Sequence, residues 1–281
     1  MLLISLSIGP LFALERGNTD VLIFAIVFAG SLLSRASERA GIFLIAMLLK
    51  LFPLATLVVD AVRQPGRNRL WPLGAIGLGI VLLAAQWRDL ILIQHGTPTV
   101  ACASYGMLSL KETLFLFFMG HGLFGSDADV VALAAVVCCL LGSLLLVAWV
   151  WKRSSRFDAS VLQTRAGDLF FVFGAIYAAT FVIRSNWDYR LIFLVPTAPF
   201  ALELMRSRAH FWGLSYIVCL LFVENCIAFE GGYKSLFAQA ATFLLFFLVI
   251  TILVEQVKSH CASAGTSVLA METGLPELEA R

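Results

Sequence analysis

Charge is scarce in this sequence. Of its 281 residues only 14% are Asp, Glu, Lys or Arg, whereas 60% are hydrophobic. Soluble domains carry about 25% charged residues. The apolar residues gather in runs that reach the roughly 20 residues a helix needs to cross a bilayer, and segments 130–151 and 235–254 contain no charge at all. The composition therefore excludes an ordinary soluble domain and predicts a helical membrane protein.

Several patterns that mark other classes of protein are also missing. The sequence shows no alternation of apolar and polar residues over about ten positions, which is typical of a transmembrane β-barrel. Its six cysteines form no CxxC or CxxH spacing, so neither a zinc site nor haem attachment is expected. No Walker loop, GxGxxG or nucleophile elbow occurs, which argues against a soluble nucleotide site. We therefore predict no metal, no cofactor and no nucleic-acid partner.

The apolar runs predict an all-α, polytopic membrane protein with about eight or nine membrane helices. The expected helices are, in chain order, 20–34, 70–86, 129–151, 168–184, 189–205, 210–229 and 235–256, with 1–14 as a partial span and 40–62 as a broken one. Residues 1–256 would form a single transmembrane domain. The polar segment 257–281 is expected to be a disordered tail.

The run 40–62 has two residues at its middle that do not suit a membrane helix, Lys50 and Pro53. Proline breaks the helical hydrogen-bond ladder, and a lysine within the membrane normally faces a cavity or a partner. Both flanking segments, 34–39 and 63–69, are basic, and basic loops prefer the cytoplasm. One full span cannot join two cytoplasmic loops, so a re-entrant hairpin is predicted. The alternative is a single kinked span with one loop that violates the charge rule.

Counting from the cytoplasmic basic loops places two polar stretches on the outer face. The first is ERGNTD, which begins at Glu15. Asn18 or Thr19 can cap the helix that follows, and Asp20 suits the positive end of the helix dipole. Capping leaves Glu15 and Arg16 unexplained, so a corner in which Arg16 meets an anionic ligand is an equally open interpretation.

The second outer stretch is RSNWDYR, which carries Arg184, Asp188 and Arg190 within seven residues. An interfacial aromatic belt explains its tryptophan and tyrosine. The two arginines run against the preference of basic residues for the cytoplasm, and the planar guanidinium suits phosphate. This stretch is therefore a candidate anion site. A buried ammonium must be paired, so Lys50 is expected to approach Glu15, Asn18 or Asp188 on the same face.

The pair Asp127 and Asp129 invites a metal-binding interpretation. Ser126, however, is a good N-cap for the helix 129–151, and both acids would then lie near the positive end of its dipole. Capping is sufficient, so we predict no metal site.

Three segments together form a familiar pattern, ERGNTDVLIFAIVFAGSLLSR, AGIFLIAMLLKLFPLATLV and NWDYRLIFLVPTAPFALEL. From about Ala13 to Leu204 the sequence resembles glycosyltransferase family 87 in these segments. Members of that family open a helix with GN or GQ and end a later aliphatic run with a lysine and a proline. The resemblance implies a GT-C-like fold and transfer of a sugar from a polyprenyl-phosphate donor at the outer face of the bacterial inner membrane. It implies that the donor is bound by Arg16, Asn18, Lys50, Arg184, Asp188 and Arg190.

The resemblance covers the later two-thirds of the family's pattern. In GT-C enzymes the catalytic base is usually an acidic residue in the first outer loop, and that region is expected to be missing here, with Glu15 as a weak substitute. Two other functions stay open. A small-molecule transporter would equally explain a broken helix with Lys50 at its centre, and a non-catalytic membrane remnant would need no site.

Overall fold

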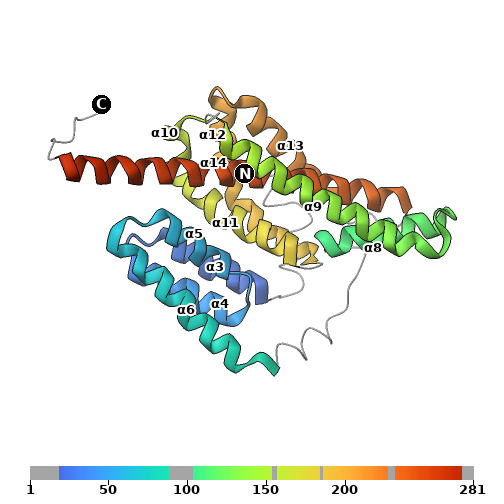
Figure 1. Cartoon of the computed structure of the whole chain (residues 1–281), viewed down its shortest axis with the longest axis horizontal. Coiled ribbons are helices and arrows are strands. Elements are labelled where there is room, and N and C mark those ends of the chain that lie inside the picture. The colour runs from blue at the N-terminus through green and yellow to red at the C-terminus, as the bar shows by residue number, and fades with distance from the viewer. Residues whose placement is uncertain (1–18, 89–103, 154–156, 184–185, 227–231, 274–281) are drawn as a thin grey trace.

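The computed structural model describes residues 19–88, 104–153, 157–183, 186–226 and 232–273, and these are nearly all helical (Figure 1). The α-helices are α3 (Thr19–Leu32), α4 (Ala36–Leu49), α5 (Leu54–Arg63), α6 (Leu70–Ala85), α8 (Met107–Gly120), α9 (Ala128–Lys152), α10 (Ala159–Leu162), α11 (Arg165–Ile183), α12 (Ala198–Arg206), α13 (His210–Cys226) and α14 (Gly232–Thr273). The 3-10 helices are η1 (Gly66–Arg69), η2 (Gly125–Asp127) and η3 (Asp188–Thr197). Two short strands, β1 (Ser104–Tyr105) and β2 (Asn186–Trp187), pair antiparallel.

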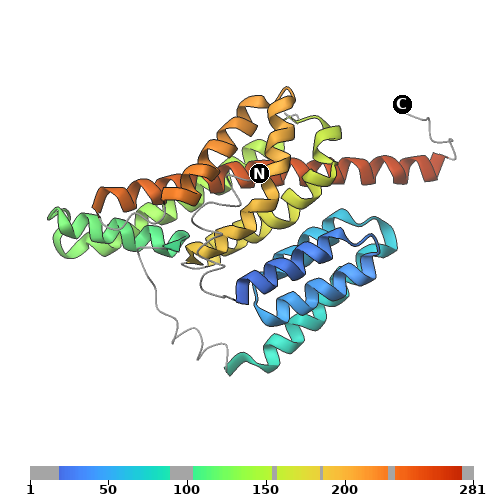
Figure 2. The same ribbon diagram turned by 180° about the vertical axis from the view of Figure 1, so that it is seen from behind.

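The helices form two groups with α11 between them. Helices α3 to α6 form one group, and α8, α9, α12, α13 and α14 form the other (Figures 1 and 2). Two hydrophobic cores meet on α11, because Phe170 and Tyr177 belong to one cluster and Phe171 and Phe173 to the other. A helix packed on both sides needs apolar residues all round, which explains why α11 has no polar stripe.

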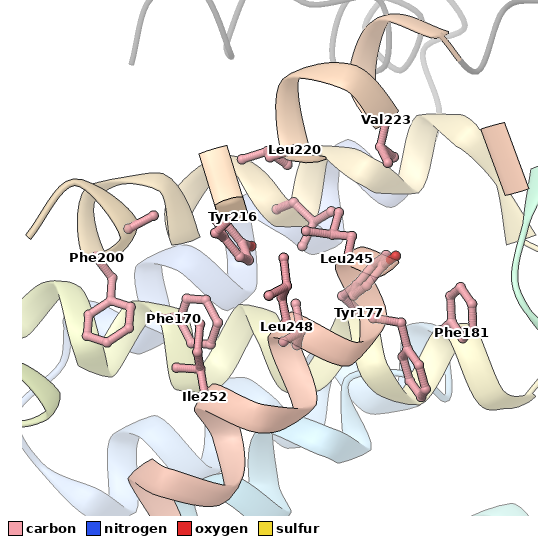
Figure 3. Close-up of a cluster of buried hydrophobic side chains, with 14 of the residues drawn as sticks. Phe170, Tyr177, Phe181, Phe200, Tyr216, Leu220, Val223, Leu245, Leu248 and Ile252 are labelled. Carbon is pink, nitrogen blue, oxygen red and sulfur yellow. The ribbon is translucent and has the colours of Figure 1, made fainter. Parts of the chain in front are cut away.

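Aromatic side chains fill the larger core (Figure 3). Phe181 stacks on Phe246 with ring centroids 4.3 Å apart, and the hydroxyl of Tyr177 donates a 2.9 Å hydrogen bond to the carbonyl oxygen of Thr242. These contacts join α11 to α14 and satisfy the polar end of a buried tyrosine.

Four helical segments in the described part of the chain are long and apolar enough to cross a membrane. They are Gly66–Ala85, Gly125–Lys152, Arg165–Val182 and Leu236–Ala262. These helices indicate a membrane protein. Four candidate spans do not support the expected eight or nine membrane helices.

Within the described residues the other apolar runs give shorter helices. Helices α3 and α4 have 14 residues each, and α13 has 17. The run 189–205 was expected as one span, but it divides into η3 and α12 close to Pro196, which cannot donate a ladder hydrogen bond. Hydropathy alone predicted 189–205 as a span because it does not register where a helix is interrupted. The partial span 1–14 lies outside the described residues.

Two boundaries also differ from expectation. Helix α14 continues to Thr273, well past the expected end of the last helix at residue 256. The segment 86–126, in which no helix was expected, contains the 14-residue helix α8.

The segment 40–62 has the shape of the predicted hairpin. Lys50 ends α4 in an extended conformation, and Pro53 precedes α5. The guanidinium Nε of Arg39, near the start of α4, lies 2.7 Å from Oδ1 of Asp60, near the end of α5. The two helices therefore fold back on each other, while the position of this hairpin in a bilayer stays a prediction.

Candidate functional site

A buried carboxylate binds two cationic side chains from distant parts of the chain. Oδ1 of Asp20 lies 2.5 Å from Nζ of Lys50, and Oδ2 lies 3.1 Å from Nε of Arg190. Asp20 is fully buried, whereas the side chains of Lys50 and Arg190 are 27% and 21% exposed. We call these three residues the Asp20 cluster.

Each member occupies an interruption or an end of a helix. Asp20 stands in the first turn of α3 and continues that helix's buried stripe of Ile23, Val27 and Gly30. Lys50 lies in the break between α4 and α5, and Arg190 lies at the start of η3. Helix spacing thus points Asp20 inward, and the break at Lys50 lets its long side chain reach it.

Aromatic rings form one wall of the Asp20 cluster. The guanidinium carbon of Arg190 lies 5.5 Å from the ring centroid of Phe52, which is itself buried. Phe52 packs edge-on against Phe193 at 5.1 Å, and Phe193 contacts Phe24. Such a wall lowers the local dielectric, which strengthens the attraction between any charges held there.

The charges of the cluster favour an anion. One carboxylate faces two cations, and both cations are partly exposed. The Lys50 ammonium has three N–H donors, and Asp20 is the acceptor that the structure shows for it. Because both cations are partly exposed, a phosphate or carboxylate could approach them and accept hydrogen bonds from them.

The structure brings together some of the predicted site residues and leaves others outside its description. Lys50 and Arg190 both bind Asp20, and the backbone of Asp188 lies in the same 3-10 helix as Arg190. The remaining candidates fall outside the described residues, namely Glu15, Arg16, Asn18 and Arg184.

Asp20 is the residue whose role sequence analysis missed. Its assignment to the helix dipole seemed complete, and Lys50 was expected to pair with Glu15, Asn18 or Asp188. The signal that could have found it is the spacing of Asp20 with Ile23 and Val27, which places the carboxylate on the buried face of α3.

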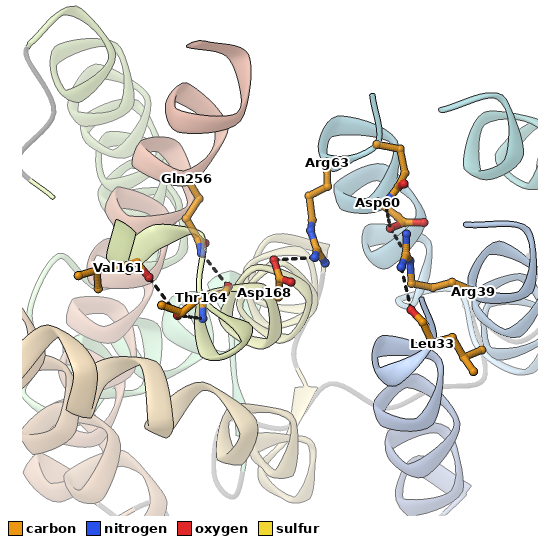
Figure 4. Close-up of polar contacts among 10 residues, drawn as sticks. Leu33, Arg39, Asp60, Arg63, Val161, Thr164, Asp168 and Gln256 are labelled. Carbon is orange, nitrogen blue, oxygen red and sulfur yellow. Dashed lines mark hydrogen bonds and ion pairs between the residues drawn. The ribbon is translucent and has the colours of Figure 1, made fainter. Parts of the chain in front are cut away.

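A second polar cluster joins the start of α4 to the end of α5, and Figure 4 shows its side chains. Besides the pair of Arg39 and Asp60, it contains an ion pair of Arg63 with Asp168 of α11 at 2.5 Å. Nη1 of Arg39 donates to the carbonyl oxygen of Leu33 at 2.9 Å. These bonds tie α4, α5 and α11 together, so we interpret this cluster as structural.

The structure does not support metal binding by Asp127 and Asp129. Among the described residues no group of three metal-binding side chains occurs. Asp129 binds Lys111 of α8 at 2.5 Å, and this hydrogen bond raises the pKa of the Lys111 ammonium above its usual range. The expected cap by Ser126 is wrong, because α9 begins without a side-chain cap. Asp129 therefore joins α8 to α9.

Comparisons with protein-family models, with curated proteins and with solved structures find no match for this chain. The resemblance to glycosyltransferase family 87 therefore rests on its three short segments alone.

Proposed function

We propose that this membrane protein binds a polyprenyl-phosphate-linked sugar through the Asp20 cluster, at the outer face of a bacterial inner membrane. The observation that carries the proposal is the pairing of one buried carboxylate with two partly exposed cations. Such a site attracts an anion, and its aromatic wall suits a ligand that is also apolar.

Two further arginines stand close to the cluster in the sequence. Arg16 is four residues before Asp20, and Arg184 is six residues before Arg190. The proposal assigns them to the same phosphate.

The proposed chemistry is sugar transfer with polyprenyl phosphate as the leaving group. Positive side chains fixed around the phosphate would stabilise the charge that develops on it as the sugar departs. A carboxylate would accept the proton of the acceptor hydroxyl, and Glu15 is the candidate base that the sequence offers.

A transporter for a small organic anion is the second candidate. The observation that favours it is the break between α4 and α5, which places Lys50 at the ends of two short helices. Transporters commonly build midplane sites from interrupted helices of this kind.

Binding measurements on the purified chain test the proposal. The ligands are a polyprenyl phosphate and the corresponding uncharged polyprenol, compared by native mass spectrometry in detergent. The wild type should prefer the phosphate, and Lys50→Met and Arg190→Met should each weaken its binding about tenfold, as expected for one lost charge-assisted hydrogen bond. Each variant keeps one cation on Asp20, so the fold should survive.

Arg208→Met is the matched control, because Arg208 is an exposed arginine in the linker between α12 and α13. It should bind as the wild type does. Equal binding of the phosphate and the alcohol would refute the proposal. Binding of small soluble phosphates that depends on Lys50, with no gain from the prenyl chain, would favour the transporter.

A further inference from the structure

We infer that an open groove between α4 and α6 binds an anionic phospholipid, with one acyl chain along the groove and the phosphate on Arg67. The groove has a volume of about 640 Å³, within the range of about 300–1,000 Å³ that is usual for small-molecule sites. Its lining is mainly apolar, with Arg67 at one end and Leu78 at the other. This inference is independent of the proposed function.

The groove exists because glycines replace side chains where two helices diverge. At one end α4 and α6 touch, since a Cβ built on Gly79 would lie 2.9 Å from the sulfur of Met47. Closer to their other ends, Gly41 of α4 and Gly74 of α6 both line the groove, and a Cβ on either would meet nothing within 4 Å. The space is therefore long, narrow and open on one side.

The position of the groove favours a lipid over a soluble ligand. It runs along α6, which belongs to the candidate span Gly66–Ala85, and only 11% of that span is buried. From Leu70 to Leu78 the helix rises about 12 Å, which is most of the roughly 15 Å of hydrocarbon in one leaflet. An acyl chain in that leaflet would lie against the groove along this length.

The charge at the end of the groove favours an anionic headgroup. Arg35 and Arg63 have carboxylate partners in Glu38 and Asp168, whereas Arg67 forms no ion pair within the described part of the chain. Its guanidinium can hold a phosphate through two parallel hydrogen bonds. Trp71 lines the same end and is more than half exposed, as expected for a side chain at the level of lipid headgroups.

This groove and the Asp20 cluster lie at opposite ends of α4. The groove's charged end is near Ser37, at the start of that helix, whereas Lys50 follows its last residue. By the charge rule the 63–69 loop faces the cytoplasm, so the groove would take a phospholipid of the inner leaflet.

Lipid retention by the full purified chain tests the inference. The probes are phosphatidylglycerol and phosphatidylcholine with identical acyl chains, and the readout is the bound lipid seen by native mass spectrometry. The wild type should retain phosphatidylglycerol preferentially. Arg67→Met should lower that retention about tenfold and remove the headgroup preference, whereas the neighbouring Arg69→Met, which does not line the groove, should stay within about twofold of the wild type.

Filling the groove gives a second, independent variant. Gly41→Leu and Gly74→Leu place side chains in open space, so they should reduce retention of both lipids without unfolding the protein. Gly142→Leu is the control, because Gly142 is an exposed glycine of α9 whose Cβ would also meet nothing. None of these changes touches Lys50 or Arg190, so polyprenyl phosphate binding should be unaffected.

Two results would overturn the inference. One is phosphatidylglycerol retention that is unchanged in both Arg67→Met and Gly74→Leu. The other is a change from dimer to monomer in Gly74→Leu with lipid retention unaltered, which would make the groove an interface between two copies of this chain.

Discussion

At the scale of single residues, the carboxylate of Asp20 stabilises the positive charges of Lys50 and Arg190 in one cluster. This carboxylate is fully buried and contacts both Lys50 and Arg190. Asp20→Asn would leave these cations facing each other without that charge, so we expect a loss of about 3 kcal/mol of stability, in line with breaking a buried ion pair. Thermal unfolding in detergent measures it.

Lys50→Met is the matched comparison, because it removes one cation and leaves Asp20 paired with Arg190. It should cost clearly less stability than Asp20→Asn. If the two variants melt at the same temperature, Asp20 does not hold the cluster together as described.

The pair of Arg39 and Asp60 gives a second residue-scale prediction. Both side chains are almost completely buried, and Nη2 of Arg39 and Oδ2 of Asp60 make no hydrogen bond. Arg39→Met leaves the buried Asp60 carboxylate with only a 3.4 Å hydrogen bond from Gln64 and should cost about 3 kcal/mol, whereas Arg39→Met combined with Asp60→Leu removes both charges and should recover most of that loss. Chemical denaturation of the three proteins checks this, and a double variant no better than the single one would contradict it.

Lys50 was a candidate because a charge within an apolar run is costly and needs a partner, and Arg190 because an arginine on the outer face runs against the charge rule. Their partner was not identified. Asp20 already had a sufficient local explanation at the start of a helix. Its spacing with Ile23 and Val27 indicates the buried face of α3, but only the packing of α3 against η3 shows that Arg190 lies there. Pairing between residues 170 positions apart depends on tertiary structure, which local patterns do not contain.

At the scale of elements, the contact between α12 and α13 depends on Gly213. A Cβ there would lie 2.5 Å from the carbonyl oxygen of Ala201 and 2.6 Å from the amide nitrogen of Met205. Because both contacts are with backbone, the helices must separate, and Gly213→Ala should cost about 2 kcal/mol even though alanine favours helix. Gly142→Ala, in open space on α9, should leave the melting temperature unchanged or slightly higher. Equal melting temperatures for the two variants would show that α12 and α13 are not packed this closely.

The elements that sequence predicted best are those with uninterrupted apolar runs. The expected helix 129–151 corresponds closely to α9, and the break at Lys50 and Pro53 divides α4 from α5 as predicted. The predicted elements were wrong where hydropathy does not indicate whether a segment forms an α-helix. Helix α8 was missed because its segment, 86–126, mixes polar and apolar residues, and η3 was predicted as part of a span because hydropathy does not distinguish a 3-10 helix.

At the scale of the whole molecule, the hairpin of α4 and α5 fixes which ends of the helices share a membrane face. Ser37 lies at the start of α4 and Asn68 lies in η1, directly after α5. Cysteines at Ser37 and Asn68, in a background without the native cysteines, should react from the same side with an impermeant thiol reagent. A cysteine at Ser126, before α9, should react from the other side. Labelling of Ser37→Cys and Asn68→Cys from opposite sides would mean that 40–62 crosses the membrane once.

If the Asp20 cluster holds the phosphate of a polyprenyl lipid, a photoreactive group next to that phosphate should cross-link to the residues around the cluster. The measurement is cross-linking with such a polyprenyl phosphate, followed by mass spectrometry of the labelled peptides. We expect labels on residues 50–54 and 188–197 that unlabelled polyprenyl phosphate competes away and that Lys50→Met greatly reduces. Labels confined to the groove between α4 and α6, or labels that neither competition nor Lys50→Met changes, would contradict this assignment of the phosphate.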